Sequence, residues 1–297
     1  MTEHDSATAL RPIAVNGTAL AALGVAVFSF TFPATHWALG GFGPWTTVAV
    51  RGVLAAVIAG VCLIAGRAPV PAREHWPGLL VVGLGVVVGF PLLTTLALTT
   101  TDTSHAAVVI GALPLATAIV AAAREGNRPS RTFWAAAVAG AGAVTVFTLA
   151  QSGGAPTTGD LYLFGALAVC AAGYAEGGRL ARVMPGLRVI SWALIAMLPF
   201  TLAGSLVALS FEPVHFGGRA LLGLAYLAAV SQVLGLMVWY RGMAAIGVAR
   251  ASQLQLAQPL LTLVWSAALL GEHLDAATPL AALAVLVCVA VTQRARA

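Results

Sequence analysis

Charged residues are scarce in this sequence, and lysine is absent. Only 8% of the 297 residues are charged, against about a quarter in an ordinary soluble domain, and all 15 basic residues are arginine. So few charges cannot cover a water-facing surface, so most of the surface must face lipid. The arginines stand singly or in small groups between apolar runs and form no basic stripe, so no nucleic-acid partner is expected.

Cysteines and enzyme motifs are also scarce. The three cysteines, Cys62, Cys170 and Cys288, each lie in an apolar run, with no CxxC pair and no histidine at ligand spacing. We interpret them as packing residues and expect no metal and no other cofactor. The sequence also lacks HExxH, GxSxG, a P-loop and paired mid-span aspartates, so neither an enzyme nor an ATP-driven motor is expected.

Long apolar runs, in contrast, fill the sequence. Sixty per cent of the residues are apolar and the mean hydropathy is +0.94. A membrane helix needs about 20 mostly apolar residues, and lipid leaves helix as the only option for such segments. Residues 1–12 lack a basic n-region and a clear cleavage site, so the first run is interpreted as a retained helix. The predicted membrane helices cover residues 17–38, 44–66, 77–98, 104–123, 132–150, 161–179, 189–210, 219–240, 249–270 and 276–293.

The arginines predict the orientation. With ten helices and a cytoplasmic N-terminus, every arginine except Arg51 and Arg219 falls on the cytoplasmic side. Positive charge is retained on that side of membranes. We therefore expect an all-α integral membrane protein of the bacterial inner (cytoplasmic) membrane, multi-pass, with both termini cytoplasmic.

The two halves of the chain resemble each other. Pro114 in the fourth predicted helix corresponds to Pro259 in the ninth, and each half holds five helices. An odd number of crossings inserts the second half upside down, which is the inverted repeat typical of secondary transporters. The predicted organisation is a cytoplasmic tail (1–16), a first five-helix repeat (17–150), an external linker (151–160), a second, inverted five-helix repeat (161–293) and a C-terminal tail (294–297).

Several stretches resemble a known family. They are Phe28-Ser29-Phe30-Thr31-Phe32, Gly43-Pro44 with Arg51, Leu113-Pro114, Trp239-Tyr240 through Gly247, Ala249-Arg250-Ala251-Ser252, Gln258-Pro259 and Gly271-Glu272-His273-Leu274. Over nearly its whole length the chain is similar to EamA-type members of the drug/metabolite transporter superfamily, and most similar to the branch that exports aromatic and other neutral amino acids. It departs from the family at Phe28, His36 and Gln258, where Trp, a basic residue and Glu are common.

The resemblance implies a secondary transporter that exports small metabolites, above all neutral or aromatic amino acids, by alternating access between the repeats. The expected partners are a small-molecule substrate and the lipid bilayer, and the sequence gives no oligomeric state. Two alternatives stay open. One is a carrier of another small solute, such as a nucleotide-sugar, a phosphorylated compound or a drug-like molecule. The other is a channel or scaffold, although a channel would need a polar stripe continuous along its helices.

Polar and aromatic side chains at depth are the candidate cavity residues. Ser252, Gln255 and Gln258 recur at i, i+3 and i+6 in the ninth helix, and facing lipid would be costly for them. The other candidates share faces of four helices and are Phe28, Thr31, Phe90, Thr94, Tyr174, Gln232 and Trp239. We expect a mostly apolar substrate-binding cavity. The alternatives are glutamines that only join helices and aromatic residues that only pack.

Prolines and charges inside the predicted helices have two interpretations each. Pro114 and Pro259 are predicted hinges for alternating access, or else static kinks. Arg51 lies two turns inside the second helix, and a structural role is favoured, with its side chain able to extend outward to the interface. Glu176 is expected to pair with Arg179, three residues on, as an ordinary surface pair more than a proton site. With no carboxylate at the midplane, downhill export is a simpler hypothesis than proton coupling.

Overall fold

The computed structural model describes residues 16–125, 130–151, 154–246, 251 and 254–296, and these fold almost wholly into helices. Within these ranges the extended pairing is a single isolated β-bridge between Phe42 and Val214. Eight helical spans there are long and apolar enough to cross a membrane: Gly17–Leu39, Pro44–Ala65, Arg73–Ala97, Thr103–Val120, Arg131–Gln151, Thr158–Leu180, Gly186–Phe211 and Gly218–Ile246. Two shorter apolar helices follow, Ala257–Leu270 and Ala277–Val291. These segments fall on the runs expected from hydropathy.

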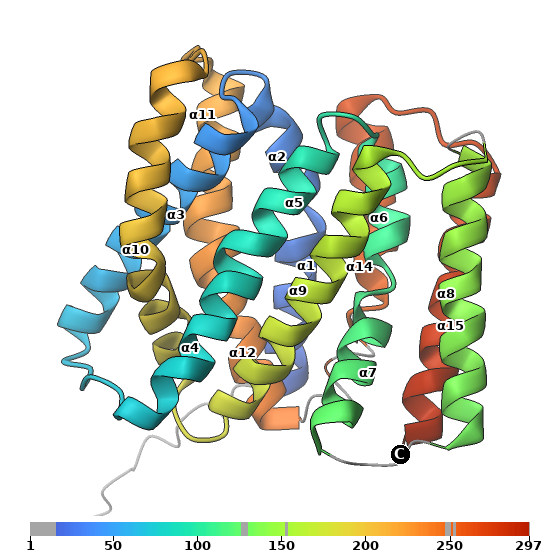
Figure 1. Cartoon of the computed structure of the whole chain (residues 1–297), viewed down its shortest axis with the longest axis horizontal. Coiled ribbons are helices and arrows are strands. Elements are labelled where there is room, and N and C mark those ends of the chain that lie inside the picture. Colours follow the sequence, from blue (N-terminus) through green and yellow to red (C-terminus); the bar gives the residue numbers. More distant parts are fainter. Residues whose placement is uncertain (1–15, 126–129, 152–153, 247–250, 252–253, 297) are drawn as a thin grey trace, which may run out of the picture.

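The helices run between two ends of the molecule (Figure 1). We call the end that holds residues 40–43 the upper end, and the end that holds residues 66–72 the lower end. The first span is bent between them. α1 (Gly17–Ser29) ends and α2 (Thr31–Leu39) begins at Phe30, because Pro33 has no N–H for the carbonyl of Ser29 and its ring crowds that turn. The predicted membrane span over 17–38 is present as Gly17–Leu39, with a bend at Phe30.

Two further breaks precede the prolines that correspond between the halves. α6 (Thr103–Ile110) stops before Gly111, and α7 (Leu113–Glu125) starts two residues later with Pro114 as its second residue. Similarly, a turn at residues 255–256 precedes α14 (Ala257–Trp265), whose third residue is Pro259. The predicted helices over 104–123 and 249–270 are therefore interrupted.

Two spans contain π-helical segments, in which each turn holds an extra residue. One of them is the span Arg73–Ala97. It joins η1 (Arg73–His75), α4 (Trp76–Val82), the π-helix η2 (Gly83–Gly89) and α5 (Phe90–Ala97). Pro91, at the start of α5, has no N–H to donate. Wider turns of this kind are rare and occur often at functional sites.

The second of these spans joins α11 (Gly218–Ala225), the π-helix η3 (Tyr226–Gly235) and α12 (Leu236–Ile246). A third π-helix, η4 (Ser266–Leu270), follows α14. η2 and η3 stand at similar places in their respective halves, between a short helix and a longer apolar one. Both π-helices contribute side chains to the central cavity described below.

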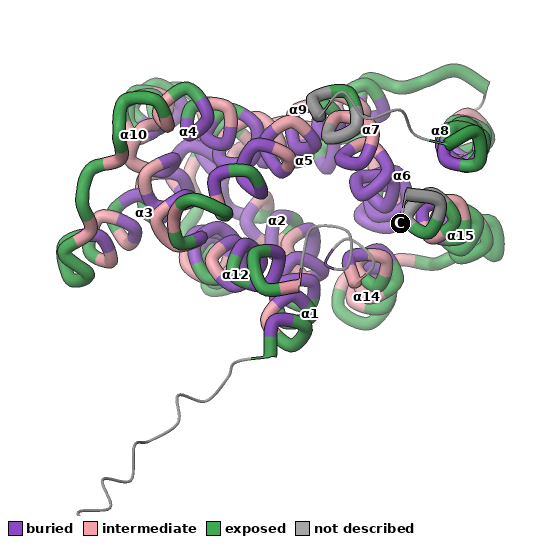
Figure 2. The backbone as a smooth tube through the Cα atoms, turned by 90° about the horizontal axis from the view of Figure 1, so that it is seen from below, coloured by how far each residue is buried: buried purple, intermediate pink, exposed green. Residues whose placement is uncertain are grey.

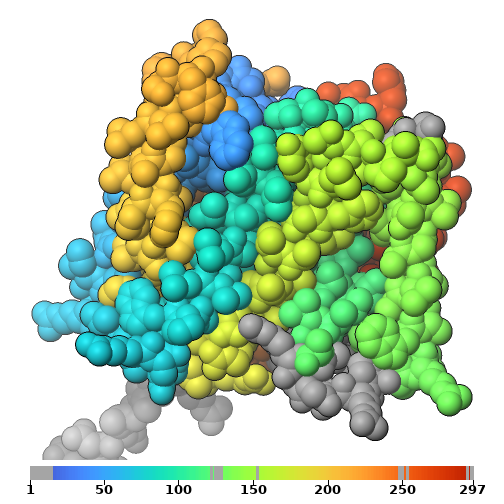
Figure 3. Space-filling model, in the orientation of Figure 1, coloured from blue at the N-terminus to red at the C-terminus, as the bar shows by residue number. Residues whose placement is uncertain are grey.

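The remaining helices surround these broken spans. α3 (Pro44–Ala65) packs along α10 (Gly186–Phe211), and α8 (Arg131–Gln151) packs along α15 (Ala277–Arg296) at the edge of the molecule (Figures 1 and 2). Figure 3 shows α10, α4 and α9 (Thr158–Leu180) side by side across one face. The breaks and the π-helical segments η2 and η3, in contrast, lie beside the cavities described below.

Apolar side chains cover the outside of the molecule. Viewed along the helices, buried positions face inward and exposed positions face outward (Figure 2). Val57, Val61 and Ile64 on α3 and Phe200 and Leu206 on α10 are each more than half exposed. An apolar surface this extensive is unfavourable in water and suits the hydrocarbon of a bilayer.

Two carboxylates from the second half of the chain cap helices of the first half at the upper end. Glu212 accepts hydrogen bonds from the N–H groups of Trp45 (3.1 Å) and Thr46 (2.7 Å) at the start of α3. Glu272 accepts from the N–H groups of Thr103 and Ser104, both at 2.9 Å, at the start of α6. Helix N-termini carry free N–H groups and a partial positive charge, so both contacts join the halves at this end.

Candidate substrate-binding cavity

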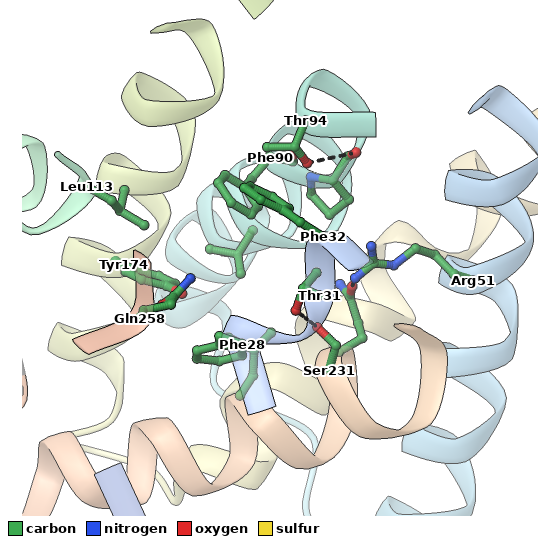
Figure 4. Close-up of a pocket in the computed structure, with 14 residues that line it drawn as sticks. Phe28, Thr31, Phe32, Arg51, Phe90, Thr94, Leu113, Tyr174, Ser231 and Gln258 are labelled. Atoms are coloured by element: carbon green, nitrogen blue, oxygen red, sulfur yellow. Dashed lines mark hydrogen bonds between the residues drawn. The ribbon is translucent and has the colours of Figure 1, made fainter. Parts of the chain in front are cut away.

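A cavity lies between the two halves of the chain, beside the bend at Phe30 and the two π-helical segments. Its empty volume, counting space open to the outside, is about 520 Å³. Residues from α1, α2, α3, η2, α5 and α7 meet residues from α9, η3, α12 and α14 around it. The lining residues are Phe28, Thr31, Phe32, Arg51, Val86, Phe90, Pro91, Thr94, Leu113, Tyr174, Ser231, Gln232, Leu236 and Gln258 (Figure 4).

Most of the candidates from the sequence meet at this cavity. Those that line it are Phe28, Thr31, Phe90, Thr94, Tyr174, Gln232 and Gln258. Trp239 is 1% exposed and lies behind the wall, with its ring centroid 6.1 Å from that of Phe28 and 6.3 Å from that of Tyr174. Ser252 lies outside the described residues.

Gln255 lines a second, smaller cavity at the two helix breaks. Pro114 and Pro259 line the same small cavity, together with Gln255 and Gln258. The predicted i, i+3 relation of the two glutamines is interrupted by the turn at residues 255–256, yet both side chains still reach this space. Gln258 lines both cavities and connects the break region to the central one.

Arg51 lies in the wall of the central cavity and does not extend to the upper interface. Arg51 is only 4% exposed, and its Nη2 donates a hydrogen bond of 2.5 Å to Oε1 of Gln232. The Nε2 of Gln232 in turn lies 3.5 Å from the carbonyl of Val87. Outward extension of Arg51 was therefore a wrong expectation, because Gln232 on the facing helix holds the guanidinium at depth.

Two hydroxyls join the halves on the same side of the cavity as Arg51. Thr31 Oγ1 and Ser231 Oγ share a hydrogen bond of 2.9 Å, and Figure 4 shows both near the guanidinium. Ser231 precedes Gln232 in η3, and both residues line the cavity. A regular α-helix would turn consecutive residues about 100° apart, so helical spacing gave no signal for Ser231.

Gln258 and Tyr174 lie on the opposite side of the cavity from Arg51 (Figure 4). The Oε1 of Gln258 is buried without a hydrogen-bond partner in the described structure. A buried amide oxygen normally finds a partner, so this atom is available to a donor group on a ligand. Between the two polar sides lie mostly the rings and aliphatic side chains of the lining residues.

The charged pair expected at Glu176 is present, away from the cavity. Arg179 donates from Nη2 to Oε1 of Glu176 at 2.6 Å, and Glu176 itself is 5% exposed. Since Glu176 is already engaged by its neighbour and does not line the cavity, the pair contributes to the lower end of α9. It does not contribute to the binding site.

A third cavity, which is wide, opens at the upper end, one helical turn beyond the central cavity. Phe32 and Thr94 line the central cavity, while His36 and Leu98, four residues further along their helices, line the upper one. Toward the lower end the packing is closer. Tyr240 is fully buried, and a Cβ at Gly177 or Gly186 would overlap its side chain. At the upper end, therefore, one helical turn separates the central cavity from the wide one.

Comparison with known proteins agrees with a transport role. The model of the EamA-like transporter family matches residues 15–149 and again residues 157–293. The "Uncharacterized transporter YdeK" of Bacillus subtilis (strain 168) is 42% identical over 279 residues, which cover 94% of this chain and 97% of that protein. One protein of known crystal structure superimposes on this chain with a TM-score of 0.67. The alignment covers 93% of this chain and 95% of that protein. Its sequence identity is only 20%, so that likeness concerns the fold alone.

These matches span nearly the whole chain, and the family is one of membrane transporters, not enzymes. A small solute as substrate and a lipid environment follow from that membership. The chain belongs to the EamA-like transporter family of the drug/metabolite transporter superfamily.

Proposed function

We propose that this protein is a secondary transporter that exports neutral amino acids, above all those with aromatic side chains, by alternating access. The central cavity carries the proposal, because both halves of the chain line it and its composition suits such a solute. Rings from Phe28, Phe90 and Tyr174 can pack on an apolar side chain, and a few polar groups can orient the backbone groups of an amino acid.

The architecture that we propose is ten transmembrane helices in two inverted repeats, residues 17–150 and 161–293, joined by an external linker (151–160) and flanked by tails at 1–16 and 294–297. Three observations support it. The family model matches twice, once in each half. The breaks before Pro114 and Pro259 correspond in position, and so do η2 and η3. Inverted repeats of this kind place the substrate between broken helices near the midplane.

The orientation that we propose places the lower end in the cytoplasm of a bacterial inner membrane. The described arginines at connections or helix ends gather at the lower end, and Arg219 lies at the upper end. With the wide upper cavity one helical turn from the central one and Tyr240 closely packed toward the lower end, we infer an outward-facing form. Pro114 and Pro259, at the breaks, are the proposed hinges through which the two repeats exchange this form for an inward-facing one.

Downhill export is the coupling that we propose. None of the described residues that line the central cavity is a carboxylate or a histidine, and proton relays in membranes use such groups. The test is efflux from loaded proteoliposomes, with and without collapse of an imposed proton gradient. Unchanged efflux supports the facilitator, and loss of efflux replaces it with a proton-coupled carrier.

Radiolabelled counterflow into proteoliposomes tests the substrate class. We expect exchange with phenylalanine, tryptophan or leucine and no exchange with sugar phosphates. Activity with a phosphorylated solute and none with any amino acid would replace the proposal with a phosphate-type carrier. Flux that does not saturate with any solute would instead indicate a channel.

A further inference from the structure

We propose that Arg51 is the anion-recognition site of the central cavity, and that it binds the carboxylate of the transported solute. This inference rests on the proposed function and names the chemical group that the site selects. It assigns to Arg51 a direct contact with the substrate, in place of a structural role.

The first argument is the incomplete hydrogen bonding of the guanidinium. Arginine presents five N–H donors, and one of them is engaged by Gln232. The Nε of Arg51 is buried with no hydrogen-bond partner. Buried donors are nearly always paired, and an unpaired one is costly in a low-dielectric interior. A ligand oxygen in the cavity would supply the missing acceptor.

The second argument is the missing counter-charge. Among the described residues, no carboxylate forms an ion pair with Arg51. Glu212 instead caps α3, and Glu176 pairs with Arg179. A cation within a membrane span normally pairs with an anion or marks a substrate path. Gln232 is neutral, so it orients the guanidinium but leaves its charge uncompensated. An anionic ligand would compensate it.

The third argument concerns which anion fits. The sequence has no lysine, and Arg51 is the sole basic residue among the described lining residues. One guanidinium matches one carboxylate in charge and in its paired N–H geometry. A phosphate carries more charge and more acceptor oxygens and would need further donors or cations. The site therefore favours a carboxylate.

The position of Arg51 also orients the rest of the solute. Thr31 and Ser231 lie on the same side of the cavity and offer hydroxyl oxygens that can accept from an amino group beside the carboxylate (Figure 4). The side chain of the solute then points across the cavity, toward Phe28, Phe90 and Tyr174. An amino acid bound in this way places its carboxylate and amino group near Arg51, and its apolar part among the rings that lie between Arg51 and Gln258.

A ligand series on the wild-type protein tests the inference without any substitution. The probes are L-phenylalanine, 3-phenylpropionate, 2-phenylethylamine and inorganic phosphate, each measured by thermal stabilisation and by competition in counterflow. We expect the two carboxylates to bind and the amine and phosphate to bind at least about tenfold more weakly. The amine loses the charge-assisted hydrogen bond, and phosphate brings charge and acceptor oxygens that one guanidinium leaves unmatched. Equal binding of the amine would overturn the inference, and stronger binding of phosphate would overturn its carboxylate assignment.

Substitutions localise the effect. Arg51→Gln should raise the apparent KM for L-phenylalanine about tenfold to a hundredfold and abolish the preference for carboxylate over amine. Arg51→Lys keeps the positive charge but lacks the paired N–H groups of the guanidinium. Its KM for L-phenylalanine should lie between those of the wild type and Arg51→Gln. Arg219→Gln, which removes an exposed arginine at the upper end, is the matched control and should change neither. An unchanged KM and selectivity in a well-folded Arg51→Gln protein would overturn the inference.

Failure of the inference and failure of the proposed function give different results. If the wild type exchanges amino acids and Arg51→Gln does so equally well, the transporter stands and the anion site falls. If no amino acid is exchanged but a carboxylate stabilises the wild type and not Arg51→Gln, the anion site stands and the amino-acid assignment falls. If no anion binds the wild type, both fall.

Discussion

The hydroxyl of Thr262 lies 2.9 Å from the carbonyl oxygen of Ser29, across the boundary between the two halves of the chain. That carbonyl is the one to which Pro33 cannot donate. Thr262 therefore supplies the hydrogen bond that the bend at Phe30 removes from the helix. Trp265, one turn further along α14, donates from Nε1 to Oγ of the same Ser29 at 3.0 Å. Two side chains of α14 thus stabilise the bend between α1 and α2.

Replacing Thr262 by valine should reduce stability, because the Ser29 carbonyl would be buried without a donor. We expect a loss of about 1 kcal/mol, the usual scale for one such hydrogen bond in proteins and in membranes. The measurement is thermal unfolding of the purified protein in detergent. Thr117→Val is the matched control, since the Thr117 hydroxyl bonds only to Leu113 in its own helix. Equal losses in both variants would show that the cross-half contact contributes nothing.

Alanine at either corresponding proline should slow transport. Alanine restores the N–H that Pro114 and Pro259 lack, which favours continuation of the helix through the breaks before them. We expect a several-fold lower turnover with little change in substrate affinity, measured as initial rate and KM in proteoliposomes. Pro199→Ala, within the continuous helix α10, should leave turnover unchanged. Normal rates for both Pro114→Ala and Pro259→Ala would make these prolines static kinks.

Much of this fold could be predicted from hydropathy and charge. Lipid requires long apolar helices, so the position of each span followed from composition. Residues spaced along one face of a predicted helix, such as Phe90 with Thr94, then met at the cavity. These features are local, because each depends on a single segment and its solvent.

Features that depend on two segments could not be predicted. The orientation of Arg51 is set by Gln232 on another helix, and the caps on α3 and α6 come from Glu212 and Glu272, far along the chain. The π-turns that contain Ser231 and Gln232 have no simple sequence signal. Pro33 indicates a bend near Phe30, but the hydrogen bond that stabilises this bend comes from Thr262, whose hydroxyl donates to the carbonyl of Ser29.

Leucine in place of Gln258 should impair transport while the protein still folds. The amide oxygen of Gln258 is buried and unpaired in the described structure, and the residue lines the space between the halves, where a donor on the solute side chain can reach it. Loss of one neutral hydrogen bond predicts about a two- to tenfold drop in kcat/KM. Gln151→Leu, at an exposed position at the end of α8, is the control for loss of a glutamine. Full activity of Gln258→Leu would remove the residue from the binding site.

Cysteine labelling in intact cells should report the two ends of the molecule on opposite sides of the membrane. The background would carry alanine at Cys62, Cys170 and Cys288. In that background Gly217→Cys places a thiol at the exposed upper end, where added atoms meet nothing within 4 Å. Glu74→Cys places one at the exposed lower end. A membrane-impermeant maleimide should label the first in intact cells and the second only after permeabilisation.

The physical reason for that expectation is the placement of arginine. Arg67 and Arg73 lie at the lower connection after α3, and Arg182 and Arg188 lie at the lower connection between α9 and α10. Near the upper connections, the described chain has a single arginine, Arg219. Basic residues remain on the cytoplasmic side during insertion. The reverse labelling pattern would place the lower end outside the cell. The wide upper cavity would then face the cytoplasm, and the same structure would be an inward-facing form.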